Sequence, residues 1–171
     1  GSSIFIIDPL YTLPLLFAVL WALWRPPART ALATGLTLSS LYLCWSMMAQ
    51  QWMTQRVMPV LAERGLDQAP RLVQPMPFST LLWRVTVLGE QQRLEIVTGV
   101  LDSGDALTVE TFPRSPQDYA EAMQVPAGRK LAWFTRGFID VEAGPDQLLV
   151  TDIRLGVPGL HPFQFVFFFF F

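Results

Sequence analysis

An aspartate stands inside the apolar stretch near the start of the chain, where it could serve chemistry. Asp8 lies between the apolar run "IFII" and Pro9 in the segment "SIFIIDPLYTLPLL". A carboxylate in such surroundings is unfavourable unless it caps a helix, pairs with another group or binds a ligand. An Asp–Pro pair is also a good helix start, with Asp as the N-cap and Pro in the first turn. The residues leave both roles open, and one side chain can fill both.

A second group of residues that could act together lies in the last third of the chain. Arg136 is part of "WFTRGFIDV", and Asp152 and Arg154 are part of "LLVTDIRLG". If these two segments pair as strands, the three side chains would form a network of two arginines and a carboxylate. Such a network could be catalytic, but a cross-strand ion pair that stabilises the sheet is the commoner case.

Other signatures of catalysis or cofactor binding are absent from the sequence. There is one histidine, His161, and one cysteine, Cys44, without the HxxxH, HxH or CxxC spacing of a metal site. The patterns GxSxG, GxGxxG and the P-loop are missing as well. The net charge is −2 without a basic block, so nucleic acid is not an expected partner. We expect no metal to be bound by this chain alone.

The elements that must position the aspartate are predicted to be membrane helices. Hydrophobic residues make up 51% of the chain, and only two charges, Arg25 and Arg29, fall between residues 10 and 52. At about 1.5 Å per residue, residues 4–24 and residues 30–52 are each about long enough to cross a ~30 Å hydrocarbon core. These segments predict a two-helix transmembrane hairpin. A buried hairpin of a soluble protein is the alternative.

The rest of the chain is predicted to be a small soluble domain that is rich in β-strands. Short segments of β type recur, and "GEQQ" and "GPD" are placed to connect two hairpins. Ser115 followed by Pro116 predicts one short helix. The predicted strands are residues 80–88, 93–101, 106–112, 130–143, 146–156 and 162–167. The predicted domains are the transmembrane hairpin (1–52), an amphipathic helix with a Pro-rich linker (53–75), the β-rich domain (76–166) and an artificial phenylalanine tail (167–171). The fold class is therefore an α+β membrane protein with a mostly antiparallel sheet.

Several of these segments, taken in order, resemble a known protein family. The most specific are "IIDPLYTLPLL" and "LLWRV", and "WFTRGF", "VTDIRLG" and "FQFVF" follow them in the chain. The chain resembles the C-terminal part of the bacterial membrane-bound metal-dependent hydrolases, an inner-membrane family also called DUF457 or YdjM-like. The resemblance covers nearly the whole chain apart from the phenylalanine tail. It implies that transmembrane segments carrying His and Asp residues precede this chain.

The resemblance also implies site residues, a cofactor and partners. Asp8 matches a polar residue of the implied site region, which makes it the candidate metal ligand and catalytic residue. Arg136, Asp152 and Arg154 match motif positions of the family, as does Arg84, and are further catalytic candidates without an assigned role. The implied cofactor is a divalent metal such as zinc, bound mainly by the upstream transmembrane region. Because catalytic zinc takes about three protein ligands, this chain alone is expected to be inactive.

The location follows from the family and from the positions of the arginines. The family implies the bacterial inner membrane, with membrane lipid and the upstream transmembrane region as partners. Arg25 and Arg29 favour a cytoplasmic loop between the helices and a periplasmic soluble domain, whereas Arg56, Arg64 and Arg71 favour the opposite. The periplasmic side is slightly preferred.

The alternative function is a membrane-anchored binding or assembly module without catalysis. It is favoured by the soluble domain, whose sequence offers no nucleophile, base or ligand cluster. Trp83, Trp133 and Phe134 could form a docking surface of such a module. The core is nevertheless the expected place for all three side chains.

Overall fold

The computed structural model describes residues 8–25, 27–77, 79–102, 107–156 and 161–168. In this part of the chain there are four helices and seven strands, and the strands form two antiparallel sheets. The chain divides into two compact units. The first consists of Gly1–Asp67, Val73–Val85 and Ile96–Val109, and the second of Gln68–Leu72, Thr86–Glu95 and Glu110–Phe171. The predicted α+β class is confirmed.

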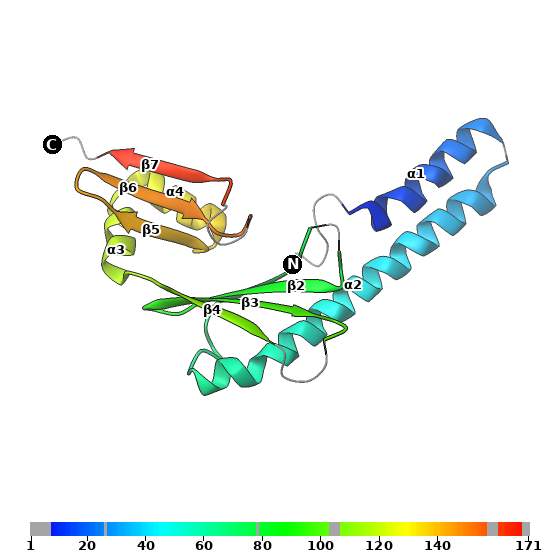
Figure 1. Cartoon of the computed structure of the whole chain (residues 1–171). Helices are drawn as coiled ribbons and strands as arrows, with labels where there is room; N and C mark the ends of the chain where they lie inside the picture. The colour runs from blue at the N-terminus through cyan, green and yellow to red at the C-terminus, as the bar shows by residue number, and fades with distance from the viewer. Residues whose placement is uncertain (1–7, 26, 78, 103–106, 157–160, 169–171) are drawn as a thin grey trace. The chain divides into compact units, whose positions relative to one another are not determined.

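The first unit begins with two antiparallel helices, α1 (Pro9–Trp24) and α2 (Arg29–Glu63), which lie along each other (Figure 1). Gly35 of α2 is buried at their contact. A Cβ built on this glycine would lie 2.5 Å from the Cβ of Ala18 and 2.7 Å from the carbonyl oxygen of Pro14. The missing side chain therefore lets the two backbones approach closely, as small residues do in membrane helix pairs.

The first helix is shorter than the span predicted from the sequence. It has 16 residues, about 24 Å in length against a hydrocarbon core of ~30 Å. Residues 4–7 of the predicted span lie outside the described part of the chain. Among the described helices, α2 is the one that is long and apolar enough, by length and composition, to cross a membrane. The helix pair is observed, and the transmembrane hairpin remains a prediction.

The second helix continues without a break through the domain boundary predicted at residue 52. Its second half carries a buried stripe at intervals of three or four residues, formed by Ser46, Ala49, Met53, Val57 and Leu61. The side chain of Gln50 donates a hydrogen bond to the carbonyl of Val73 at 2.9 Å, which ties this half to a strand of the same unit. Gly65, with a φ of 66°, follows the end of the helix, because glycine adopts this conformation without strain.

The first sheet has the strand order β1-β2-β3-β4. Its strands are β1 (Arg71–Pro75), β2 (Leu82–Leu88), β3 (Gln92–Gly99) and β4 (Thr108–Pro113). The predicted hairpin around "GEQQ" and the strand after it are confirmed. The predicted linker is wrong in part, because its last residues, 71–75, form strand β1. Pro75 is compatible with a strand here because it ends an edge strand, where its missing N–H is tolerated.

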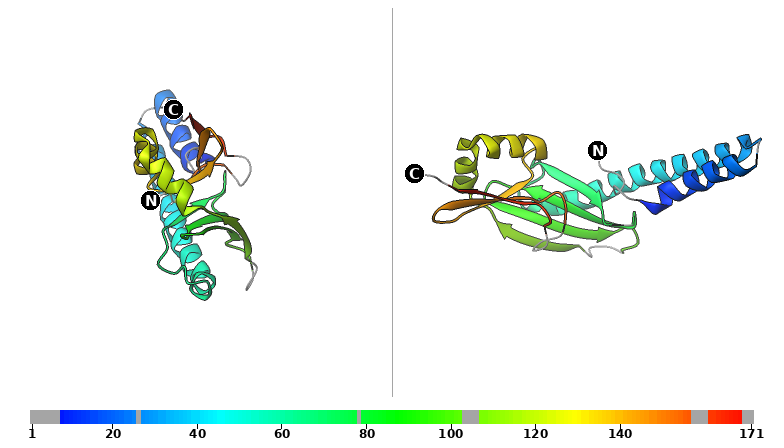
Figure 2. Two further views of the ribbon diagram at one scale, coloured as in Figure 1. Left: turned by 90° about the vertical axis from the view of Figure 1, so that its left-hand side faces the viewer. Right: turned by 90° about the horizontal axis from the view of Figure 1, so that it is seen from above.

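The second unit contains a sheet of order β5-β6-β7 and two helices that lie on one side of it (Figure 2). The strands are β5 (Ile139–Ala143), β6 (Gln147–Asp152) and β7 (Gln164–Phe168), and the helices are α3 (Pro116–Gln124) and α4 (Pro126–Thr135). Both strand pairs are antiparallel, with Val141 opposite Val150 and Leu149 opposite Val166. The hairpin around "GPD" and the last strand are confirmed.

The prediction of one short helix in this region is wrong. Ser115 caps α3 as expected, since its Oγ accepts the backbone N–H of Asp118 at 3.1 Å. A second helix, α4, follows at once, and it contains residues 130–135, which were predicted to begin a strand. A short apolar run is compatible with either element, and packing decides between them.

The core of the second unit explains why that run is helical. The buried side chains are Ala122, Ala132, Ile139, Val141, Leu148 and Val150, and Tyr119, Met123, Val125, Leu131 and Phe167 pack against them. The helix turns Leu131 and Ala132 towards the sheet. Phe167 lies opposite Leu148 in the strand pairing. Phe167 therefore belongs to the last strand, as predicted for residues 162–167, although it was also counted as the first residue of the artificial tail. Residues 169–171 lie outside the described part of the chain.

Candidate functional site

The carboxylate of Asp8 is buried at the N-terminus of α1. The residue is 3% exposed, and its Oδ1 accepts a hydrogen bond from the backbone N–H of Leu10 at 3.0 Å. Pro9 occupies the first turn, so the predicted cap is confirmed. The hydroxyl of Thr12 donates to the backbone carbonyl of Asp8 at 2.9 Å.

The second carboxylate oxygen is bound by a polar group from α2. Tyr42 donates its hydroxyl hydrogen to Oδ2 of Asp8 at 2.7 Å. The hydroxyl oxygen of Thr80 lies 3.4 Å from that of Tyr42 and accepts a hydrogen bond from Nε1 of Trp45 at 3.3 Å. These four residues are called the Asp8 cluster. Its members are far apart in the sequence, so no local spacing could have revealed the contact.

The Asp8 cluster lies well away from the turn that joins the two helices. Tyr42 is about 20 Å along α2 from Arg29, at ~1.5 Å per residue. Thr80 belongs to the segment between β1 and β2 of the same unit. The buried carboxylate is therefore placed where the helix pair meets the sheet-bearing part of the first unit.

The Asp8 cluster does not form a complete metal site. Catalytic zinc takes about three protein ligands, and Asp8 is the one carboxylate of the cluster. Both of its oxygens already accept hydrogen bonds. No group of three or more His, Cys, Asp or Glu residues that could hold a metal is found among the described residues. The residues present do not fit a bound metal by themselves, and further ligands would have to come from outside the described part of the chain.

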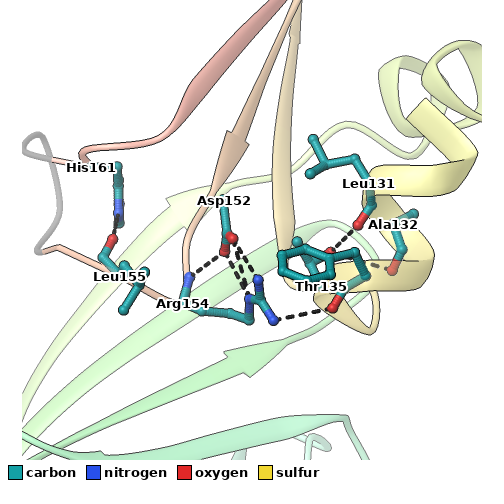
Figure 3. A network of polar contacts seen from close by, with 8 residues as sticks. Leu131, Ala132, Thr135, Asp152, Arg154, Leu155 and His161 are labelled. Atoms are coloured by element: carbon teal, nitrogen blue, oxygen red, sulfur yellow. Dashed lines mark hydrogen bonds and ion pairs between the residues drawn. The ribbon is translucent and has the colours of Figure 1, made fainter. Parts of the chain in front are cut away.

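Asp152 and Arg154 are brought together in the second unit (Figure 3). Nε of Arg154 lies 3.0 Å from Oδ1 of Asp152, and its Nη2 lies 2.7 Å from Oδ2, a bidentate contact. The carboxylate is 4% exposed and also accepts the backbone N–H of Arg154 at 3.0 Å. Nη1 of Arg154 donates to the carbonyl of Phe134 at 3.1 Å. The pair thus ties the end of β6 to the last turn of α4.

The third member of the predicted network, Arg136, does not join this pair. It ends α4 in a left-handed conformation with a φ of 56°, and its side chain is exposed. The two segments do pair as strands, but β5 begins only at Ile139, which lies opposite Asp152, so Arg136 precedes the strand. His161 lies in a loop, with Nδ1 at 2.8 Å from the carbonyl oxygen of Leu155.

Replacing Arg154 by alanine is expected to lower the free energy of unfolding by about 1–3 kcal/mol, because the buried carboxylate of Asp152 loses its charged partner. Urea unfolding of the full chain in detergent micelles measures this loss. Arg154→Lys keeps the charge but not the bidentate contact, so we expect a smaller loss for it. Equal stability of the wild type and Arg154→Ala would contradict a structural role for the pair.

A buried group of charges on the first sheet was missed at the sequence level. Arg93 and Glu95 of β3 are 4% and 2% exposed. Nε of Arg93 lies 3.8 Å from Oε1 of Glu95, and its Nη1 lies 3.5 Å from Oδ2 of Asp140. The guanidinium stacks over Phe112 at 4.7 Å from the ring centre, and Thr86 donates to Oε2 of Glu95 at 2.8 Å.

The spacing of these charged residues in the sequence could have indicated the ion pair. Arg93 and Glu95 are two residues apart, so they share one face of a strand, and that strand is predicted from otherwise apolar residues. Opposite charges at this spacing indicate an ion pair on the sheet surface, and only the three-dimensional structure shows that they are buried. These contacts link β3 to Phe112 of β4 and to Asp140 of β5.

No protein-family model, no curated protein and no solved structure matches this chain. The resemblance to membrane-bound hydrolases therefore rests on the quoted segments alone. What the chain does has to be argued from those segments and from the geometry around Asp8.

Proposed function

We propose that this chain is the C-terminal part of an integral-membrane, metal-dependent hydrolase of the bacterial inner membrane. In this proposal the α1–α2 pair anchors the protein in the bilayer, and Asp8 contributes to one edge of the catalytic site. The divalent metal and most of its ligands belong to the upstream transmembrane region. The chain alone would then be inactive.

The observation that carries the proposal is the buried carboxylate of Asp8. It begins a helix that contains no charged residue, "PLYTLPLLFAVLWALW". A neutral Asn or Ser would cap the helix as well without the unfavourable burial of a charge. Ionisable groups within apolar helix pairs are rare and are typical of functional sites. The hydrogen bond from Tyr42 would hold the carboxylate in a fixed orientation.

Membrane anchoring is supported by the exposed apolar surface of the two helices. Only 17% of the apolar window of α2 is buried, whereas the core helix of a soluble protein would be mostly covered. The large exposed side chains of the pair include Leu16, Phe17, Leu20, Trp21, Leu36, Leu41 and Met48. Apolar surfaces of this extent are typical of contact with lipid or with other helices.

The position of the Asp8 cluster suggests where the reaction would occur. Because the cluster lies about 20 Å from the Arg29 end of α2, and the hydrocarbon core is ~30 Å thick, Asp8 would lie towards one face of the membrane. A lipid headgroup ester or another membrane-proximal ester could reach that depth. The proposed substrate class is therefore a membrane-proximal ester.

The test is Asp8→Asn in the intact membrane protein. Asparagine is as good an N-cap as aspartate, so the helix start is retained while the charge is lost. We expect metal content and ester hydrolysis to fall by about 10- to 100-fold, the usual result of weakening a metal site. Metal analysis of the purified protein and hydrolysis of a short-chain ester measure the two quantities.

The control is Asp146→Asn, which removes the same charge from an exposed turn. It should leave metal content and hydrolysis at the wild-type level. If Asp8→Asn also retains both, Asp8 is a helix cap and not a site residue.

A non-catalytic, membrane-anchored module is the second candidate function. It is favoured by the fact that both oxygens of Asp8 already have hydrogen-bond donors, Leu10 and Tyr42. In this case the role of Asp8 is to link α1 to α2 through its hydrogen bond with Tyr42. Asp8→Asn and Tyr42→Phe would then lower the thermal stability of the full chain without any change in bound metal.

A further inference from the structure

Two large aromatic side chains project into solvent from α4. Trp133 is 80% exposed and Phe134 is 61% exposed, so the expectation that both belong to the core is wrong. Trp83, by contrast, is fully buried as expected. The opposite side of α4 is buried through Gly128 and Ala132. The helix is therefore amphipathic, with aromatic residues on its exposed side.

The charges that accompany these aromatic residues are positive. Arg129, Lys130 and Arg136 are exposed on or directly after α4, and the helix itself contains no acidic residue. Arg154 adds a guanidinium that lies over the ring of Phe134, 4.7 Å from its centre. The charge of Arg154 is balanced by Asp152. Within the described residues, no carboxylate pairs with Arg129, Lys130 or Arg136, although Nη1 of Arg129 donates to the carbonyls of Met123 and Gln124 at 3.0 and 3.1 Å.

We propose that this basic aromatic surface, formed by Arg129, Lys130, Trp133, Phe134 and Arg136, binds the surface of an anionic phospholipid bilayer. Short helices that combine exposed Trp or Phe with Lys or Arg lie at the boundary between headgroups and acyl chains. Trp prefers this boundary because its ring is apolar and its N–H can reach water. The cations are attracted by acidic headgroups, so charge complementarity selects lipid as the occupant.

The inference rests on the membrane anchoring in the proposed function and not on hydrolysis. An anchored chain keeps its second unit close to lipid, so even a weak surface contact would be populated. The contact would hold α4 at the membrane whatever chemistry the protein performs.

The experiment uses the full chain reconstituted into vesicles, with a polarity-sensitive fluorophore on single cysteines. The native Cys44 is exposed on α2 and reports whether the helix pair is inserted. In a Cys44→Ser background, Trp133→Cys reports the environment of α4, and Gln117→Cys on the exposed side of α3 is the matched control. Vesicles of phosphatidylcholine are compared with vesicles that contain about one third phosphatidylglycerol, an anionic lipid.

We expect the probe at position 133 to enter an apolar environment in the anionic vesicles, and the probe at position 117 to stay in water. Lys130→Glu together with Arg136→Glu should lower the ratio of docked to free α4 by at least about 25-fold, since each lost Lys or Arg contributes about fivefold near an anionic surface and the added glutamates are repelled by it. High salt should also lower the ratio of docked to free α4, because it screens the attraction between charges.

Three results would overturn the inference, and they are distinguishable. If the probe at position 44 is buried in lipid while position 133 stays in water, the surface does not bind lipid and a protein partner is favoured. If position 44 also stays in water, the anchoring in the proposed function fails first. The probe at position 133 could also report the same apolar environment whatever the lipid charge and with or without the Glu substitutions. That result would contradict the proposed attraction between the cations and the anionic headgroups.

Discussion

Replacing Glu95 by alanine is expected to lower the free energy of unfolding by about 3–5 kcal/mol, because it removes one partner of a buried ion pair. The carboxylate is 2% exposed and accepts the hydroxyl of Thr86 at 2.8 Å. Among the described residues, Arg93 would keep the carboxylate of Asp140, at 3.5 Å, and the ring of Phe112. Urea unfolding of the full chain in detergent micelles measures the loss.

The contacts of Arg93 explain why the expected loss of stability is large. Its Nε and Nη1 are buried and make no hydrogen bond within the described residues, although carboxylates lie at ion-pair distance. The guanidinium is thus held by charge and stacking more than by directed hydrogen bonds. Loss of the nearby charge would leave the buried cation poorly compensated, which is the larger part of the cost.

A rescue variant and a control separate this effect from loss of packing. In Glu95→Ala with Arg93→Met, no buried cation is left alone, so we expect recovery of about half or more of the lost stability. Glu142→Ala removes an exposed carboxylate from β5 and should change stability by less than about 0.5 kcal/mol. If Glu95→Ala behaves like Glu142→Ala, the ion pair contributes little to the fold.

Local signals in the sequence were sufficient for several helix ends. Asp8 with Pro9 and Ser115 with Pro116 each start a helix because the side-chain oxygen satisfies a free backbone N–H. Gly65 ends α2 because the chain needs a left-handed residue there. These effects act within a few residues, so spacing alone reveals them.

The errors arose where packing outweighs local preference. Residues 130–135 have the apolar and aromatic composition of a strand, yet they form the last turns of α4 and turn Leu131 and Ala132 to the core. Pro126 at the first turn and Gly137 after the last one are helix signals that were available. Residues 71–75 show the converse case, in which a proline-rich segment pairs at a sheet edge.

The candidate site could be predicted only in part for the same reason. The burial of Asp8 follows from its apolar neighbours, and its capping role follows from Pro9. Its partner Tyr42 and the neighbouring Thr80 depend on how α1 packs along α2, which is a long-range property. The pairing of Asp152 with Arg154 was accessible because they are two residues apart, whereas the place of Arg136 depended on the helix that was missed.

Replacing Gly35 by leucine is expected to separate α1 from α2 and to lower the free energy of unfolding by about 3 kcal/mol, at the upper end of the cost of overpacking. The new Cβ would lie 2.5 Å from the Cβ of Ala18, and the carbonyl of Pro14 at 2.7 Å cannot yield without moving the helix. Hydrogen exchange of the α1 amides and thermal unfolding of the full chain measure the separation. Ala33→Leu adds bulk to an exposed position of α2 and should change neither quantity.

The same substitution connects the fold to the proposed site. The hydrogen bond from Tyr42 to Asp8 and the one from Ser39 to the carbonyl of Tyr11, both below 3 Å, require the close approach that Gly35 permits. Gly35→Leu in the intact protein should therefore lower metal content as Asp8→Asn does, although the carboxylate itself is unchanged. If the helices separate while bound metal stays at the wild-type level, Asp8 lies outside the metal site, and its burial serves only to fasten α1 to α2.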